Sequence, residues 1–297
     1  MLALSGATGL VGRYLCNELI AKNIPFKLLG RDIAFSSDRS SFYFFDLSQP
    51  LDKSLYTFLE DVDIVIHLAA LLPSSSSQLA DYFLCNSFAS KALFDLCSDV
   101  GVSRFIYLSG ANLMEPVDGV VTTSSPYASR LRHPSYLASK MAGELLLLNT
   151  DSSTDLLIIR PSSIYGYNIK SGLFRTLYDS FVLSKSVRLS GNGLWSADYI
   201  YAGDVCECII SAIENSATGT LTLGSGTAST ILQIARTFTS LLGVEDDLIF
   251  LEDSDVSSIP LDCLPIVSNE QVVSLLGRNP LSVSEGLNHA IASYGSF

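Results

Sequence analysis

Tyr136 and Lys140 are the residues whose types and spacing point most directly to chemistry. They stand four positions apart in a segment that opens with Pro134, and residues 134–149 are predicted to form a helix. Residues four apart share one face of a helix, so the Lys140 ammonium is expected beside the Tyr136 phenol.

This pairing bears on the pKa of Tyr136. A phenol ionises with a pKa of about 10, which makes it a poor base at neutral pH. A cation about 4 Å away, at an effective dielectric of about 20, favours the phenolate by about 4 kcal/mol, or roughly three pKa units. We therefore expect Lys140 to bring Tyr136 toward a pKa suited to acid–base catalysis, although ordinary surface pairs share this spacing.

Three evenly spaced glycines follow a short apolar run at the start of the chain. Residues 1–4 are predicted to form a buried strand, and a helical pattern follows, so Gly6, Gly9 and Gly12 fall at the junction. Gly6 permits a turn that other residues avoid, Gly9 lets the backbone approach a pyrophosphate, and Gly12 lets the helix lie close to the strand. The expected cofactor-binding residues here are Gly6, Thr8, Gly9, Leu10, Val11, Gly12 and Arg13.

The end of the second predicted strand, residues 25–29, bears on the choice of cofactor. In dinucleotide-binding folds an acid at this place binds the adenosine ribose, whereas an arginine accommodates a 2′-phosphate. Gly30 stands where the acid is expected and Arg31 follows it, with Arg13 as a second cation. We therefore expect NADP rather than NAD; the alternative is that Asp32 binds the ribose and Arg31 is only solvated.

Further strands are predicted at 42–45, 63–66 and 104–108, and residues 79–100 are expected to form one long amphipathic helix. This alternation predicts an α/β fold, a Rossmann-type doubly wound parallel sheet that binds ligands beyond the carboxyl ends of its strands. The other residues expected to contact the cofactor at these ends are Asp46, Leu47, Leu68, Ala69 and Ala70. His67 is interpreted as a buried, hydrogen-bonded ring rather than a catalytic one.

The composition narrows the function classes. Of 297 residues, 48% are hydrophobic and 16% charged, so the chain can bury a large core. A net charge of −12 argues against nucleic acid as a partner. No apolar run reaches the roughly 18 residues of a membrane span, so we expect a cytoplasmic protein with no membrane partner. The six cysteines form no C-x-x-C pair, and no metal site is expected.

Six weak motifs occur together in the order and spacing of one family. They are the glycine turn, residues 67–70, Ser109, Tyr136 with Lys140, residues 160–166 and residues 198–205. From its first residue to about Thr222 the chain thereby resembles the extended short-chain dehydrogenase/reductase family of nucleotide-sugar epimerases, dehydratases and reductases.

The resemblance implies roles for particular residues. Tyr136 is the implied acid or base, Lys140 binds the cofactor ribose and tunes the tyrosine, and Pro161 with Ser163 borders the nicotinamide. A homodimer formed through the helices at 79–100 and 136–149 is implied as well.

Departures from the family pattern limit these implications. The family usually has Ser or Thr immediately after a first Ser at the fifth strand end, whereas Gly110 follows Ser109 here, so Ser109 is the candidate catalytic hydroxyl. Ala111 and Asn112 replace the Asp-Glu pair of the 4,6-dehydratases, which disfavours dehydration.

A third departure concerns the substrate. Ala197 stands where many members have an arginine that binds the substrate diphosphate, and the candidates to replace that arginine are Arg175, Arg188 and Lys170.

We expect a dinucleotide-binding domain at 1–165, to which 201–223 returns, and a smaller C-terminal α/β substrate lobe at 166–200 and 224–297. The leading hypothesis is an NADP(H)-dependent oxidoreductase, a ketoreductase or epimerase, that acts on a small-molecule substrate, a nucleotide-linked sugar. The alternatives are a carbonyl reductase for a non-sugar ketone and a dinucleotide-sensing protein without catalysis.

Overall fold

The computed structural model describes residues 1–32, 41–74, 76–167, 172–252 and 263–294. Its contacts divide the chain into two compact units. The first unit comprises residues 1–115, 123–161 and 209–221, and the second comprises residues 116–122, 162–208 and 222–297. The serine-rich segment 254–258, predicted to be a surface loop, and Lys170 lie outside the described residues.

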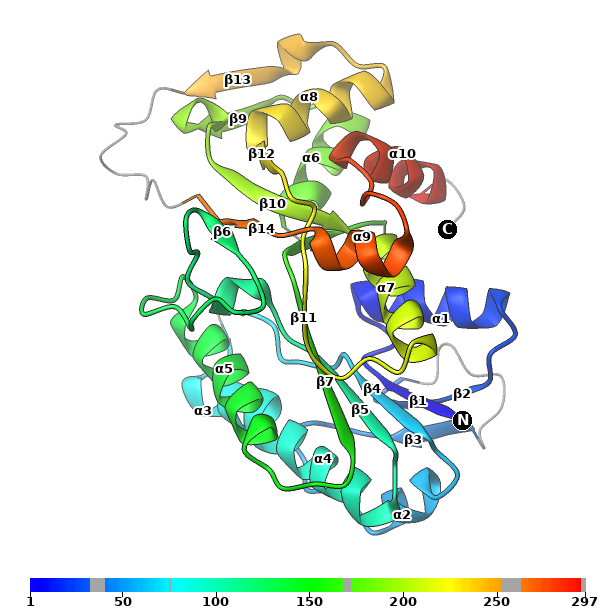
Figure 1. Ribbon diagram of the computed structural model, residues 1–297. Helices are drawn as coiled ribbons and strands as arrows, with labels where there is room; N and C mark the ends of the chain where they lie inside the picture. The colour runs from blue at the N-terminus through cyan, green and yellow to red at the C-terminus, as the bar shows by residue number, and fades with distance from the viewer. Residues whose placement is uncertain (33–40, 75, 168–171, 253–262, 295–297) are drawn as a thin grey trace. The chain divides into compact units, whose positions relative to one another are not determined.

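A seven-stranded sheet in the order β11-β7-β5-β4-β1-β2-β3 is the framework of the first unit (Figure 1). Its strands are β1 (Leu2–Ser5), β2 (Phe26–Gly30), β3 (Phe42–Phe44), β4 (Ile64–His67), β5 (Arg104–Leu108), β7 (Asp155–Pro161) and β11 (Gly219–Leu223). The neighbours from β7 to β3 pair in parallel, and the strand order reverses at β1. The predicted doubly wound parallel sheet is confirmed.

Both faces of this sheet are buried, which explains why its strands are nearly continuous apolar runs. In β1, Ala3 and Leu4 point to opposite faces, and neither is exposed. Ala3 belongs to an apolar cluster that includes side chains of three helices, namely α2 (Ser54–Leu59), α4 (Ala89–Val100) and α5 (Pro134–Leu148). Helix α1 (Leu10–Ala21) lies on the side of the sheet opposite to α4 and α5 (Figure 1).

The helix predicted at 79–100 is interrupted. It consists of α3 (Leu79–Phe83), a π-helical turn (Leu84–Phe88) and α4. The predicted helix is therefore present with its predicted bounds, but the π turn was not foreseen, because apolar periodicity does not reveal one extra residue in a single turn. The π turn contains Asn86, whose side chain is completely buried.

The second unit combines short strands with helices. Its three-stranded sheet has the order β12-β10-β8, and two further strand pairs are β13 with β9 and β14 with β6. The strands are β6 (Val120–Val121), β8 (Ser163–Tyr165), β9 (Val187–Ser190), β10 (Ser196–Tyr201), β12 (Ala228–Thr230), β13 (Ile249–Glu252) and β14 (Ile266–Val267). The helices are α6 (Leu173–Val182), α8 (Ile231–Leu242), α9 (Glu270–Leu276) and α10 (Val283–Tyr294), and α7 (Ala202–Glu214) begins here and ends in the first unit.

The described residues contain neither a membrane-spanning helix nor a cluster suited to a metal ion. None of the helices described is both long and apolar enough to cross a bilayer. Among the same residues no group of three or more His, Cys, Asp or Glu side chains is arranged to hold a metal ion.

Candidate active site

The glycine turn has the geometry that its sequence predicts. Gly6 has a φ of +79°, and a Cβ there would lie 2.6 Å from the backbone nitrogen of Ala69. A Cβ on Gly12 would lie 2.1 Å from the Gly6 carbonyl oxygen, so α1 approaches the turn this closely only because the residue is glycine. Gly9 is exposed and occupies the N-cap of α1. A bare, exposed backbone at a helix N-terminus suits the pyrophosphate of a dinucleotide.

The two cations expected near a 2′-phosphate have different surroundings. Arg13 is partly buried, and its Nε donates to the carbonyl oxygen of Thr8 at 3.1 Å, within the glycine turn. Arg31 is exposed just after β2. Hydrogen bonds from Ser48 lower the pKa of Asp46, and the Arg31 charge lowers it further, so Arg31 and Asp46 act on each other at the carboxyl edge of the sheet.

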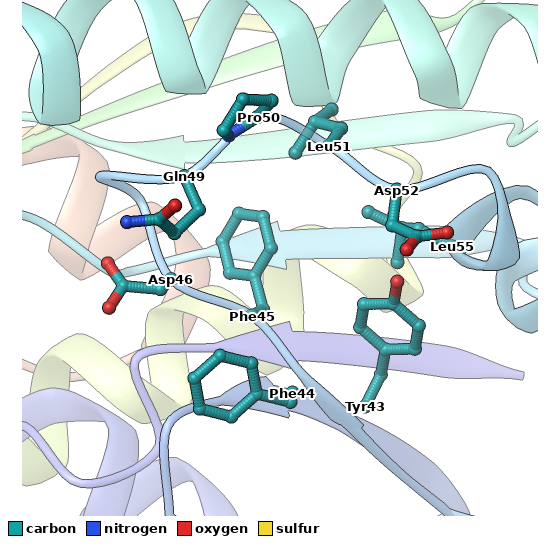
Figure 2. Close-up of a pocket in the computed structure, with 9 residues that line it drawn as sticks. All are labelled: Tyr43, Phe44, Phe45, Asp46, Gln49, Pro50, Leu51, Asp52 and Leu55. Carbon is teal, nitrogen blue, oxygen red and sulfur yellow. The ribbon is translucent and has the colours of Figure 1, made fainter.

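A cavity of about 350 Å³ opens beside edge strand β3 (Figure 2). It is lined by Tyr43, Phe44, Phe45, Asp46, Gln49, Pro50, Leu51, Asp52 and Leu55. The carboxylates of Asp46 and Asp52 already accept hydrogen bonds from Ser48 and Ser54 in the loop after β3. Strands β2, β1 and β4 separate β3 from β5, so this cavity is not the place where Ser109 would act.

The strand end of β4 is held by serine hydroxyls. The two ring nitrogens of His67 lie 2.7 Å from Ser5 Oγ and 3.0 Å from Ser90 Oγ, and burial lowers the pKa of His67 to about 3. The interpretation of His67 as a buried, satisfied ring is confirmed. Leu68 donates its N–H to the carbonyl oxygen of Ser5, and Ala69 donates its N–H to the Ser5 hydroxyl. Residues 68–70 are only partly buried at this end of the sheet.

Lys140 is buried inside the first unit. Only 3% of the residue is exposed, its Nζ donates to the carbonyl oxygen of Leu108 at 2.7 Å, and the same atom lies 4.0 Å from the centre of the Tyr107 ring. Burial lowers the pKa of Lys140 to about 7, against an opposing effect of the Glu144 charge. The amine is therefore fixed at the end of β5, where Ser109 follows.

Tyr136 lies in the first turn of α5 and packs edge-on against Tyr82, with ring centres 6.3 Å apart. Burial raises its pKa to about 12. The expectation that Lys140 lowers the pKa of this phenol was wrong for the protein in this state. Lys140 directs its amine to Leu108 and Tyr107, and it has itself lost much of its preference for the charged form.

Ser109 has the chemical character expected of a substrate-binding hydroxyl. Its Oγ is buried and has no hydrogen-bond partner among the described residues, although its N–H donates to Ile159 at 2.7 Å. An unpartnered buried hydroxyl is unusual, because leaving it unpaired costs about 1–3 kcal/mol. Gly110 has an extended backbone, and a Cβ there would meet no atom within 4 Å.

Pro161 and Ser163, which the family resemblance places beside the nicotinamide, belong to different units. Pro161 ends β7 in the first unit, and Ser163 begins β8 in the second. The candidates for a diphosphate-binding arginine lie in the second unit, where Arg175 pairs with Asp179 at 2.7 Å and Arg188 with Glu252 at 3.1 Å.

Asn86 is a site residue to which sequence reasoning gave no role. Its amide donates to the carbonyl oxygen of Leu71 and to Ser139 Oγ, both at 3.0 Å, and its side-chain oxygen accepts from the Leu71 N–H at 2.7 Å. Its own carbonyl oxygen accepts from the Tyr107 hydroxyl at 3.1 Å. Asn86 thereby fixes the loop after β4, helix α5 and β5 relative to one another. The available signal was a short amide side chain inside an apolar helix pattern.

These residues of the first unit fit a nicotinamide dinucleotide. The bare turn at Gly9 suits a pyrophosphate, and the partly open strand ends leave room for ribose and ring. The unpartnered Ser109 hydroxyl and the buried Lys140 amine supply polar groups at the end of β5.

Comparison with known proteins points to one family. Residues 2–224 match the model of the NAD dependent epimerase/dehydratase family. The chain is 23% identical over 318 residues to YtcB of Bacillus subtilis, described as an uncharacterised UDP-glucose epimerase, with 98% of this chain and 97% of the relative covered. It is 30% identical over 173 residues to 3beta-hydroxysteroid-dehydrogenase/decarboxylase isoform 2 of Arabidopsis thaliana, which covers 57% of this chain and 30% of that protein.

Solved structures share the fold. MoeE5, in complex with UDP-glucuronic acid and NAD, superposes with a TM-score of 0.81 at 22% identity and covers 100% of this chain and 99% of its own. The UDP-glucose 4-epimerase of Thermus thermophilus, in complex with NAD, has a TM-score of 0.81 at 19% identity, with 99% and 98% covered. The family match and the shared fold confirm the predicted nicotinamide-dependent enzyme, while the preference for NADP stays a prediction. The chain belongs to the NAD-dependent epimerase/dehydratase family and is an enzyme of the extended short-chain dehydrogenase/reductase type.

Proposed function

We propose that the chain is an NADP(H)-dependent oxidoreductase, a ketoreductase or epimerase, whose substrate is a nucleotide-linked sugar. The observation that carries this proposal is on α5, where Tyr136 lies one turn before the buried Lys140. The Lys140 amine reaches the carbonyl of Leu108, next to the unpaired hydroxyl of Ser109. The substrate class is supported by similar folds solved with UDP-glucuronic acid or UDP-glucose together with NAD.

Each residue has a distinct role in the proposed reaction. When bound, the nicotinamide ring supplies or accepts the hydride. Tyr136 exchanges a proton with the substrate oxygen, and Ser109 donates a hydrogen bond to that oxygen. Because burial holds the pKa of Tyr136 at about 12, the tyrosine begins as a neutral phenol that is ready to donate. This starting state suits the reduction of a carbonyl.

Lys140 acts on the tyrosine and on the cofactor ribose. Its ammonium form stabilises the phenolate that remains after proton donation. With its pKa lowered to about 7, a substantial part of the lysine is neutral at physiological pH, so its charge state is sensitive to neighbouring groups.

The proposed preference for NADP rests on Arg31 and Arg13. Arg31 is exposed after β2 and acts on Asp46, and Arg13 is held at the glycine turn through Thr8. Two arginines near the adenosine end of the cofactor favour a 2′-phosphate. A hydrogen bond between charged groups contributes about 1.5–3 kcal/mol to binding. We therefore expect the KM for NADPH to be at least tenfold lower than the KM for NADH.

The substrate lobe and the homodimer stay proposals, as does the cytoplasmic location. The second unit includes both segments of the predicted substrate lobe, 166–200 and 224–297. The dimer is supported by apolar side chains that are 43–58% exposed on α3, the π turn and α5, namely Leu79, Leu84, Phe88, Leu145 and Leu148. Exposed apolar surface gathered on neighbouring helices is typical of a protein interface.

The experiment is a turnover assay of the purified chain with NADPH or NADH and a panel of UDP- and dTDP-linked keto-sugars and sugars. Stoichiometric oxidation of NADPH with a keto-sugar supports the ketoreductase. Interconversion of sugar isomers without net consumption of cofactor supports the epimerase. If free UDP and dTDP change neither activity nor melting temperature, the nucleotide-sugar substrate is contradicted.

A second candidate is a carbonyl reductase for a non-sugar ketone. It is favoured by Ala197, which is completely buried in β10 where many members have the diphosphate-binding arginine, and by the likeness to the steroid dehydrogenase. A cyclic ketone that is reduced while nucleotide sugars are not would favour it.

A further inference from the structure

Helix α5 carries a third ionisable side chain one turn beyond Lys140. Glu144 is completely buried and accepts hydrogen bonds from Arg160 on β7. Arg160 Nε lies 3.1 Å from each carboxylate oxygen, and one terminal nitrogen lies 2.6 Å from Oε2. The hydroxyl of Tyr127 donates to the same Oε2 at 2.8 Å. Glu144, Arg160 and Tyr127 form what we call the Glu144 cluster.

Stability alone is a poor explanation for this cluster. Removing both charges from water costs several kcal/mol per ion, and their attraction only roughly offsets that cost, so an apolar trio of similar volume would serve a fold as well. Arg160 is only 5% exposed and Glu144 is not exposed. The position of the cluster on the helix that carries Tyr136 and Lys140 suggests a role in their chemistry.

The neighbours of Lys140 show which charge can act on it. The titratable groups that act on Lys140 or contact it are Glu144 on its own helix, His67 on β4 and Tyr107 on β5. Tyr136 lies one turn earlier on the helix, and Arg160 on β7 reaches Glu144. His67 is neutral at working pH, because burial lowers its pKa to about 3. Tyr107 stays neutral too, because burial raises the pKa of its hydroxyl. Glu144 is thus the acid in this group that favours the Lys140 ammonium.

We propose that Glu144 is a positioning residue that keeps Lys140 protonated, and that the hydrogen bonds from Arg160 and Tyr127 hold its carboxylate in place. The inference rests on the roles proposed above for Tyr136 and Lys140. Burial and Glu144 push the charge state of Lys140 in opposite directions, and the Glu144 cluster sets where they balance.

Opposite charge changes at the two ends of the pair test this proposal. Glu144→Gln removes a negative charge and leaves Arg160 uncompensated, so the pKa of Lys140 falls by about one unit. Arg160→Met removes the positive charge and raises it. Tyr127→Phe keeps both charges, and we expect a smaller shift in the direction of Glu144→Gln. The pKa is read from the ¹³Cε signals of labelled lysine, assigned with Lys140→Arg, and kcat and KM are measured across the same pH range.

We expect the alkaline limb of kcat to follow the lysine. In Glu144→Gln, activity one pH unit above neutrality falls about tenfold, since one pKa unit is a factor of ten, while KM changes little. Asp95→Asn is the matched control, because it makes the same charge change at the partly exposed Lys91–Asp95 pair of α4 and should shift neither measurement. Tyr127→Phe provides a test if either charge variant fails to fold.

The outcomes separate this inference from the proposed function. An unchanged lysine pKa in folded Glu144→Gln overturns the inference. A shifted lysine signal with an unshifted kcat profile supports the coupling and overturns instead the role proposed for Lys140.

Discussion

Two buried acids, Glu144 in the first unit and Asp198 in the second, show how differently a carboxylate is used in the two parts of the chain. Glu144 is bound by side chains, an arginine and a tyrosine, and lies one turn from a lysine. Asp198, in β10, is bound by backbone. Its Oδ1 accepts from the Ser225 N–H at 2.9 Å, and its Oδ2 accepts from Gly226 and Val267 at 3.1 and 3.0 Å.

The different partners indicate different roles for the two acids: Asp198 supports the fold, whereas Glu144 acts on the candidate active site. Three backbone donors fix Asp198 as an anchor for two distant loops, and only 1% of the residue is exposed. Glu144, by contrast, is held by side chains, and its charge acts on Lys140 of the candidate active site. Asp198 begins the motif at 198–205, and Glu144 lies on the helix of Tyr136 and Lys140, so a position in or beside a motif does not by itself say what a residue does.

Tyr136→Phe is the strongest test of the chemical side. It removes the proton donor without changing ring packing against Tyr82, so we expect kcat to fall by at least about 10³-fold, a loss within the range that general acid–base catalysis supplies. The free energy of unfolding should change by less than about 1 kcal/mol. Both are measured on the purified variant by turnover assay and urea titration, with Tyr43→Phe as control. Residual activity above a tenth of wild type would remove Tyr136 from the reaction.

Asp198→Asn tests the architectural side. The amide presents an N–H group to backbone donors, so at least one buried N–H loses its acceptor and the free energy of unfolding falls by about 3 kcal/mol. Below the unfolding transition kcat should change by less than about threefold, since the residue acts on stability. Glu245→Gln, an exposed acid of the same unit, is the control in urea titrations. A large loss of kcat in fully folded protein would show that Asp198 acts on catalysis as well as on stability.

Ser109→Ala tests whether the hydroxyl at the end of β5 belongs to the active site. Among the described residues the hydroxyl has no partner to lose, so unfolding should be unaffected, whereas kcat falls about a hundredfold, the lower end of the effect of removing one such donor. Gly110→Ser in the Ser109→Ala background restores part of the activity, because a side chain at 110 meets open space. Unaltered kinetics in Ser109→Ala would show that Tyr136 works without this hydroxyl.

Much of the first unit could be predicted from the sequence because its constraints are local. Only glycine tolerates the φ of Gly6 and the contact at Gly12, so these positions show the turn directly. Apolar runs separated by helical patterns predicted a doubly wound parallel sheet, and a histidine within such a run indicated a buried ring.

What failed was set by contacts distant in sequence. The pKa of Tyr136 depends on where Lys140 directs its amine, and that depends on the Leu108 carbonyl and the Tyr107 ring, which periodicity cannot locate. The π turn at Leu84–Phe88 and the bonding of Glu144 to Arg160 likewise arise only when helices and strands pack. Spacing predicts which residues share a helix face, but not which partner each one selects.

The smallest expected effect is that of His67 on stability. His67 is a buried titratable group of the first unit, yet its role is structural, so the contrast between Glu144 and Asp198 does not extend to every such group of the two units. Its folded-state pKa, about 3, lies below the ordinary 6.5. Between these values the unfolded chain binds a proton that the folded chain does not, so acid favours unfolding. Lowering the pH from 7 to 5 should therefore lower the free energy of unfolding by about 2 kcal/mol through this ring.

His67→Gln tests this prediction, because its amide can still bond to Ser5 and Ser90. In urea titrations at the two pH values, this part of the pH dependence should be lost in His67→Gln. The control His133→Gln changes an exposed histidine and should keep it. If the variant loses as much stability as wild type on acidification, the ring is protonated in the folded protein, and its proximity to Lys140 would have to be counted as chemistry.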